Sequence, residues 1–226
     1  CVRREGMRRN VEIGEISDGK FYSSNDMAKL SCSGCGGCCR GMGHSVILDP
    51  WDIWEMTRNL GVTFDDLLSE AVELQVVDGV ILPNLKMIGQ GESCFFLSSE
   101  NRCRIHKFRP GVCRLFPLGR YYQGNTFQYF VQKGECHHPA KIKEKIHKWI
   151  GIPSLRLYEK YIREWHAFLK EAENAVERLK DPQSTKNLCL YILNQFYRKP
   201  YGAERDFYAQ FEERLREAKA LLALEN

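Results

Sequence analysis

The feature that most constrains this chain is a group of four cysteines within eight residues, in the stretch CSGCGGCCR at 32–40. Reduced thiolates are soft ligands that select zinc, copper(I) or iron–sulfur clusters. The two-residue gaps let successive thiolates turn toward one centre. Gly34, Gly36 and Gly37 can take the positive φ angles that such a tight wrap requires. The stretch therefore predicts a metal site.

The ten cysteines are grouped along the sequence, and the long stretches 40–93 and 137–188 contain none. A secreted disulfide framework would spread them more evenly, so we favour metal binding in the reducing cytosol, with oxidative pairing as the alternative. The sequence contains no apolar segment of membrane-spanning length and no signal-peptide core. We therefore expect a cytoplasmic protein that does not enter a membrane.

The formal net charge is only +4, and four arginines lie within the first ten residues. We interpret them as a solvated basic end rather than a nucleic-acid contact. No other run resembles a nucleic-acid groove, so the expected partner is another protein. The sequence does not define the oligomeric state.

A second group of cysteines follows between residues 94 and 136. Cys94 and Cys103 flank a segment that predicts a hairpin, which would bring the two thiols together. With the first four cysteines this gives eight candidate metal ligands, namely Cys32, Cys35, Cys38, Cys39, Cys94, Cys103, Cys113 and Cys136. Eight thiols suggest two four-thiolate sites. Neighbouring side chains of an extended backbone point to opposite sides, so Cys38 and Cys39 are expected to join different sites. One site with spare thiols is the alternative.

Several arginines lie within a few residues of these cysteines. Four thiolates around zinc or an oxidised [4Fe–4S] core leave about two negative charges, which nearby cations would offset. We expect Arg40, Arg109 and Arg114, together with Arg104, to donate hydrogen bonds around the ligands. Ordinary solvated surface is the alternative. Cys189, in an apolar run, is expected to be a small buried hydrophobe.

Patterning along the chain predicts an α+β fold. Three regions are expected: an N-terminal arm at 1–29, a cysteine-cluster domain of short strands, loops and two helices at 30–140, and a helical extension at 141–226. Capping signals predict the two helices after Asp49-Pro50 and after Thr63. Other expected elements are a strand at 45–48, hairpins at 74–82 and 121–131, and helices from 154, at about 185–197 and from 207.

The motif CSGCGGCCR, followed by CFFL and CRIHKFRPGVCRLFP and then a later lone cysteine, resembles the CxxCxxCC cysteine-cluster family. Members of this family are expected to chelate zinc or iron, and it includes the cysteine-rich part of flagellin lysine N-methylases. The resemblance covers roughly residues 30–140 and implies that the eight cysteines are the metal ligands. For the methylase branch it implies an iron–sulfur cluster and methyl transfer from S-adenosylmethionine to flagellin lysines.

Three functions are compatible with these observations. The favoured one is an iron–sulfur protein, with a [4Fe–4S]-type cluster used for electron transfer, sensing or support of a protein-modifying reaction. A structural zinc module for protein interaction is the first alternative. A protein lysine methyltransferase using S-adenosylmethionine is the second, and it depends on the resemblance alone. Whether the chain is an enzyme stays open at this point.

Overall fold

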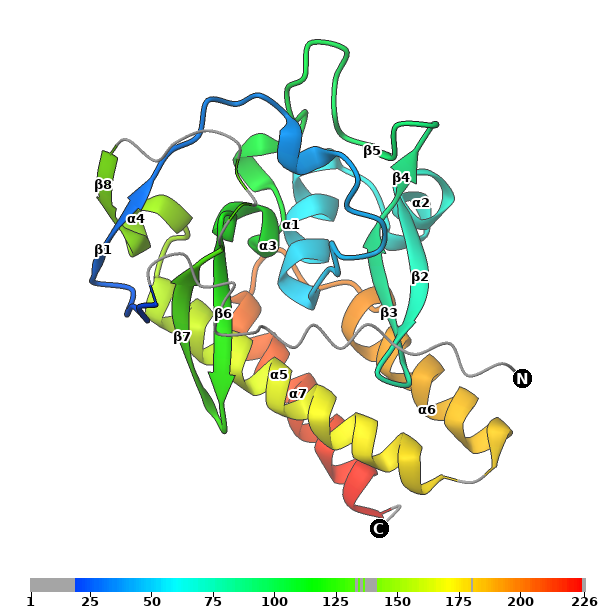
Figure 1. Cartoon of the computed structure of the whole chain (residues 1–226). Helices are drawn as coiled ribbons and strands as arrows, with labels where there is room; N and C mark the ends of the chain where they lie inside the picture. The colour runs from blue at the N-terminus through cyan, green and yellow to red at the C-terminus, as the bar shows by residue number, and fades with distance from the viewer. Residues whose placement is uncertain (1–18, 133, 135, 137–141, 180, 225–226) are drawn as a thin grey trace. The chain divides into compact units, whose positions relative to one another are not determined.

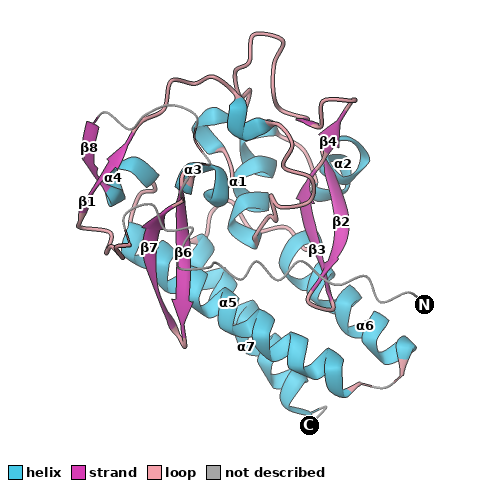
Figure 2. Ribbon diagram, in the orientation of Figure 1, coloured by secondary structure: helices cyan, strands magenta, loops and turns pink. Residues whose placement is uncertain are grey.

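The computed structural model describes residues 19–132, 134, 136, 142–179 and 181–224 (Figure 1). Short two-stranded sheets occupy the N-terminal part of the chain, and the longest helices lie toward the C-terminus (Figure 2). This arrangement confirms the α+β class. Within the described ranges, no helix is both long and apolar enough to cross a membrane. The first 18 residues of the expected N-terminal arm lie outside the described part of the chain.

The described residues divide into two compact units. The helical unit comprises residues 47–84 and 164–224, and the cysteine unit comprises residues 19–46 and 85–163. Helix α5 (Leu155–Arg178) supplies its first nine residues to the cysteine unit and the rest to the helical unit. All eight candidate metal ligands belong to the cysteine unit, whereas Cys189 belongs to the helical unit.

The helical unit combines one hairpin with several helices. Its elements are α1 (Pro50–Leu60), α2 (Phe64–Glu70), β2 (Val72–Val77), β3 (Val80–Leu85), α6 (Pro182–Leu193), the π-helical turn η4 (Asn194–Arg198) and α7 (Phe207–Leu224). Helix α7 lies along the later part of α5 (Figure 1), where Lys219 and Glu171 form an ion pair at 2.6 Å. The buried rings of Trp165, Phe168 and Phe196 have centroids 5.0–5.6 Å apart. Burial of each such ring contributes about 2 kcal/mol, so this cluster adds substantially to the stability of the unit.

The expected helix starts are confirmed. The Asp49 carboxylate accepts a hydrogen bond from the Asp52 amide at 2.9 Å, with proline at the next position, and Gly61 ends α1 with a φ of 69°. Thr63 caps α2 in the same way through the Asp66 amide. These caps satisfy amide groups that have no partner inside the helix, which is why local sequence defines both boundaries.

A proline at position 83 predicts a strand that lies at a sheet edge or stops early. β3 lies at the edge of a two-stranded sheet and continues to Leu85, whereas two other expected element limits are wrong. The Pro83 carbonyl accepts the Leu48 amide at 2.8 Å, so the missing N–H of proline faces the segment around Ile47 and leaves the β2–β3 ladder intact. The expected strand at 45–48 is reduced to a single bridge between Ile47 and Asn84. The second C-terminal helix begins at Pro182, with Asp181 as its cap, rather than at 185.

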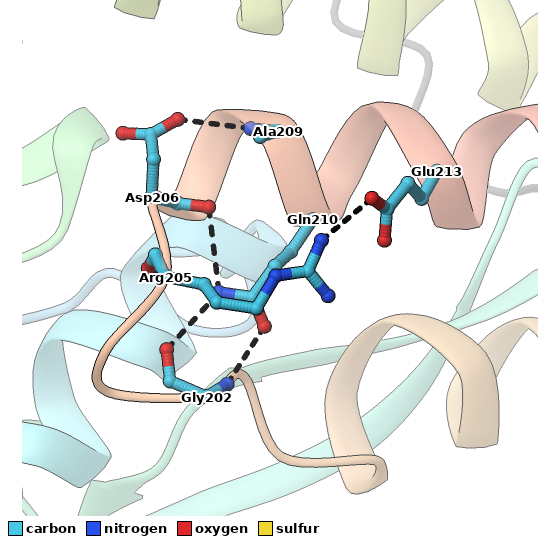
Figure 3. A network of polar contacts seen from close by, with 6 residues as sticks. All are labelled: Gly202, Arg205, Asp206, Ala209, Gln210 and Glu213. Atoms are coloured by element: carbon cyan, nitrogen blue, oxygen red, sulfur yellow. Dashed lines mark hydrogen bonds and ion pairs between the residues drawn. The ribbon is translucent and has the colours of Figure 1, made fainter.

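The buried side chain of Gln210 helps to hold the loop before α7 (Figure 3). Gln210 is 6% exposed; its side-chain oxygen accepts the Gly202 amide at 2.7 Å, and its nitrogen donates to the carbonyl groups of Gly202 and Arg205. The Asp206 carboxylate accepts the Ala209 amide at 2.9 Å and so caps α7. The polar backbone of the loop is thereby satisfied without regular structure.

The cysteine unit is built from three two-stranded antiparallel sheets and short helices. Strand pairs are β1 (Met27–Leu30) with β8 (Ile142–Lys145), β4 (Met87–Ile88) with β5 (Ser93–Cys94), and β6 (Leu118–Gln123) with β7 (Thr126–Val131). The short helices are η2 (Gly37–Cys39), η3 (His106–Phe108), α3 (Gly111–Leu115) and α4 (Ile146–Ile150). The Tyr129 hydroxyl of β7 donates to the Glu159 carboxylate of α5 at 2.9 Å, which fastens the β6–β7 hairpin to the helix within this unit.

Candidate metal centre

The first cysteine loop leads out of β1 and ends in the short 3-10 helix η2. Cys32, Cys35 and Cys38 are exposed and Cys39 is half-buried. Gly34 and Gly36 have φ angles of 67° and 72°, as the tight wrap of the sequence predicts. Four thiols therefore lie on a compact loop with access to solvent.

Several cysteine sulfur atoms accept a hydrogen bond from the backbone amide two residues further along the chain. The amides of Gly34 and Gly37 donate to the sulfur atoms of Cys32 and Cys35, each at 3.4 Å. The same two-residue offset recurs in the second group, where the Phe96 amide donates to Cys94 and the Ile105 amide to Cys103. Hydrogen bonds of this kind stabilise the thiolate form, which is the form that binds metal. Two separate segments thus present thiols in the same local geometry.

The predicted hairpin between Cys94 and Cys103 is confirmed. Leu97 bridges Cys103 across the turn, and the Arg104 amide donates to the Phe96 carbonyl at 2.9 Å. Burial raises the pKa of both thiols, and the charge of Cys103 raises the pKa of Cys94 further. The hairpin therefore brings the two thiols close enough to interact.

Cys38 and Cys39 differ from the sequence expectation. Their backbone was assumed to be extended, with the side chains on opposite sides, but it forms the turn η2. The Cys39 thiol donates a hydrogen bond to the Cys38 sulfur, which lowers the pKa of Cys38 to about 6 and raises that of Cys39. The charges of Cys94 and Cys103 also raise the pKa of Cys39. Four thiols from the two cysteine groups therefore form one electrostatically coupled set, which we call the thiol cluster: Cys38, Cys39, Cys94 and Cys103.

The remaining two candidates lie further along the chain. Cys113 is half-buried on helix α3, and Cys136 is half-buried beside residues outside the described ranges. The neighbouring His137 and His138 lie outside those ranges. Among the residues that the structure describes, no three His, Cys, Asp or Glu side chains converge at a spacing suited to a metal ion. The described thiols of the two groups are thus close enough to affect one another's pKa but do not form a coordination sphere.

Two arginines fasten the first cysteine loop to the second group. Arg40 donates to the side chains of Ser93 and Asn101, each at 2.6 Å. Arg102 donates to the Gly34 carbonyl at 3.2 Å. Sequence reasoning selected Arg40 but missed Arg102 and Asn101. The only sequence signal for Asn101 is its place at a hairpin tip, where it takes a φ of 58°.

Arg109 follows the short helix η3, and Arg114 lies on α3. The charge of Arg109 lowers the pKa of Cys38 and of Cys103, and its side chain contacts His106. Arg114 donates to the Arg109 carbonyl at 3.0 Å and thereby holds that segment. Burial, followed by the charges of Arg109, Arg114 and Arg102, lowers the pKa of His106. The surroundings of the thiols are therefore strongly cationic.

The donor set fits a thiolate-bound metal group. The Arg109 Nε atom is buried and has no hydrogen-bond acceptor among the residues that the structure describes. A buried donor without a partner is costly, so an anionic group beside Cys38 and Cys103 would satisfy it. Thiols, amide donors and a surplus of positive charge are the features expected of a cysteine-rich metal-chelating domain.

Comparison with known proteins agrees with this class. Residues 31–138 match the CxxCxxCC family model, which is described as a "Putative zinc- or iron-chelating domain", and this confirms the resemblance seen in the sequence. The matched stretch contains all eight candidate cysteines. An uncharacterized protein of Methanocaldococcus jannaschii is 29% identical over 116 residues, which cover 51% of this chain and 56% of the relative. The match thus spans about half the length of this curated relative. No solved structure matches the chain.

Proposed function

We propose that this protein is an iron–sulfur protein whose cysteine unit carries a [4Fe–4S]-type cluster used for electron transfer or redox sensing. The observation that carries the proposal is the set of sulfur-directed donors. Four cysteines accept amide hydrogen bonds at the same two-residue offset, and the buried Arg109 Nε has no acceptor within the described ranges. Hydrogen bonds to sulfur and nearby charge are the means by which proteins tune such clusters.

The Arg109 Nε atom, which has no acceptor among the described residues, favours an iron–sulfur cluster over zinc. A four-thiolate zinc site offers only the cysteine sulfur atoms as acceptors. An iron–sulfur cluster adds inorganic sulfides, and these offer further acceptors to a buried donor such as the Arg109 Nε atom. The Arg104 guanidinium lies 5.2 and 5.9 Å from the ring centroids of Phe95 and Phe96. These residues provide apolar surface and positive charge beside the candidate metal centre.

The eight cysteines are the residues that would hold the metal group, and they stay candidates. When bound, the group would supply one-electron transfer. The chain's own part is to stabilise the thiolates through the amides of Gly34, Gly37, Phe96 and Ile105 and to offset their charge with the surrounding arginines. Methyl transfer rests on the family resemblance alone and is not included in the proposal.

The test is iron, zinc and acid-labile sulfide analysis of protein purified without oxygen, with a visible spectrum. We expect iron with matching sulfide, and zinc without sulfide would overturn the iron–sulfur assignment in favour of a structural module. Cys94→Ser should lose metal. The matched control is Cys189→Ala, because Cys189 is 2% exposed in the helical unit and donates only to the Gly79 carbonyl at 3.5 Å. Equal metal loss in both variants would show that the effect is on folding and not on ligation.

A further inference from the structure

The outer face of the β1–β8 sheet carries a concentrated positive charge. Strand register places Lys29 directly opposite Lys143 and Met27 directly opposite Lys145. Directly opposed residues, and residues two apart along a strand, share a face. All four side chains are exposed, whereas Ala28 and Leu30 on the other face are buried. We call this set the basic face: Met27, Lys29, Lys143 and Lys145.

The three ammonium groups of the basic face are uncompensated. In the described ranges none of them takes part in an ion pair. Glu144 points to the opposite face of its strand. The neighbouring Asp26 carboxylate already accepts the Ser23 amide at 2.7 Å and the Ser23 hydroxyl at 2.8 Å. Like charges directly opposite in a sheet are destabilising, so the Lys29–Lys143 pair weakens the fold rather than supporting it.

The basic face is joined directly to the candidate metal centre. Lys29 is three residues before Cys32, so their Cα atoms lie within about 10 Å of each other at full extension. A protein bound to this face would therefore lie beside the exposed end of the first cysteine loop. Charge complementarity at such a place steers encounter and raises association rates.

We infer that the basic face docks an acidic protein surface that serves the metal centre. The mixture of lysine with the exposed Met27 suits a protein partner, because methionine adapts to varied apolar surfaces. The basic face is less suited to nucleic acid, since it lacks arginine side chains to bind phosphates and aromatic side chains to stack on bases. The role of the partner as an electron carrier rests on the proposed function, whereas docking itself does not.

The test uses the full chain, purified without oxygen, and a fluorescein-labelled oligoglutamate peptide as the probe. Lys143→Glu with Lys145→Glu should weaken binding about tenfold, as expected for loss of two exposed charge contacts. Lys143→Glu also places a carboxylate opposite Lys29, so the variant should unfold at the same or a higher temperature. The matched control reverses two exposed lysines of the helical unit, Lys186 and Lys199, and should bind as the wild type does.

Equal weakening in the control variant would overturn the docking face and leave only a net-charge effect. Tighter binding of a labelled DNA oligonucleotide through the same lysines would overturn the protein partner in favour of nucleic acid. Metal and sulfide analysis of the same samples separates the two proposals. Zinc without sulfide, with the peptide effect intact, would remove the electron-transfer role and leave the docking face standing.

Discussion

The Arg40 guanidinium donates a hydrogen bond to the Asn101 side-chain oxygen at 2.6 Å, although the residues are 61 positions apart. Its other amino group donates to Ser93, and the Gly41 amide donates to the Glu92 carbonyl at 3.0 Å. One arginine therefore fastens the first cysteine loop to the segment that carries the second cysteine group. This contact is therefore one of those that hold the two groups of thiols near each other.

Replacement of Arg40 by alanine should speed the loss of metal. Groups that orient metal ligands typically change metal affinity by about 10- to 100-fold, and we expect about tenfold because Arg40 acts on the loop and not on a sulfur atom. The measurement is the rate of metal release to an excess of chelator. Arg58→Ala is the control, since Arg58 is an exposed arginine of α1 in the helical unit, where it pairs with Glu55 at 3.4 Å and lies over the Trp54 ring. Equal release from both variants would contradict the role of the Arg40 contact.

A second prediction concerns the positive φ angles of the first loop. Gly36 and Gly41 have similar φ angles, 72° and 63°, so alanine costs about 1 kcal/mol of backbone strain at either position. A Cβ at Gly36 would lie 3.0 Å from the Asn101 carbonyl and 3.2 Å from a Leu97 methyl, whereas nothing lies within 4 Å at Gly41. Gly36→Ala should therefore lower metal retention and thermal stability more than Gly41→Ala. Equal losses would mean that strain alone matters.

Local signals in the sequence account for much of this fold. The helices after Asp49 and Thr63 each begin where the side chain of the capping residue accepts the amide three positions later. The β6–β7 hairpin turns at Gly124 and Asn125. Each of these features depends on residues that are neighbours in sequence, so the pattern is sufficient to predict it. The hairpin that pairs Cys94 with Cys103 is predictable for the same reason.

The features that sequence reasoning missed depend on distant contacts or on backbone conformation. Nothing near Asn101 in sequence indicates that it meets Arg40. Cys38 and Cys39 were assigned to opposite sides because the backbone was taken as extended, and the turn η2 removes that premise. The continuation of β3 past Pro83 likewise depends on which side of the strand its carbonyl faces, and this is decided by pairing with Leu48.

In metal-free protein the thiol cluster should show unequal reactivity. The hydrogen bond from Cys39, followed by the loop backbone and the charge of Arg109, lowers the pKa of Cys38 to about 6, whereas the pKa values of Cys39, Cys94 and Cys103 are raised. Because the thiolate is the nucleophile, Cys38 should be alkylated first at neutral pH.

The direction of each pKa shift predicts how the alkylation rate of each cysteine changes with pH. The alkylation rate of Cys38 should fall as the pH drops through about 6, because the thiolate is then protonated. The rates of Cys94 and Cys103 should still be rising above the ordinary thiol range, because burial raises their pKa values. Peptide mass spectrometry after brief iodoacetamide treatment measures each site. A Cys39→Ala variant should return the midpoint of Cys38 toward that range, and an unchanged midpoint would exclude the hydrogen bond as the cause.

Metal removal should loosen the cysteine unit and leave the helical unit folded. Metal binding to cysteine sites is coupled to folding, so chelation removes free energy from the unit that supplies the ligands. Helix α1 provides the sharp comparison, because it lies inside the matched stretch 31–138 but belongs to the helical unit. Hydrogen exchange should therefore show protection lost in the β6–β7 hairpin and retained in α1 and in the helices around Phe196. Loss of protection in α1 together with the hairpin would mean that the two units unfold as one.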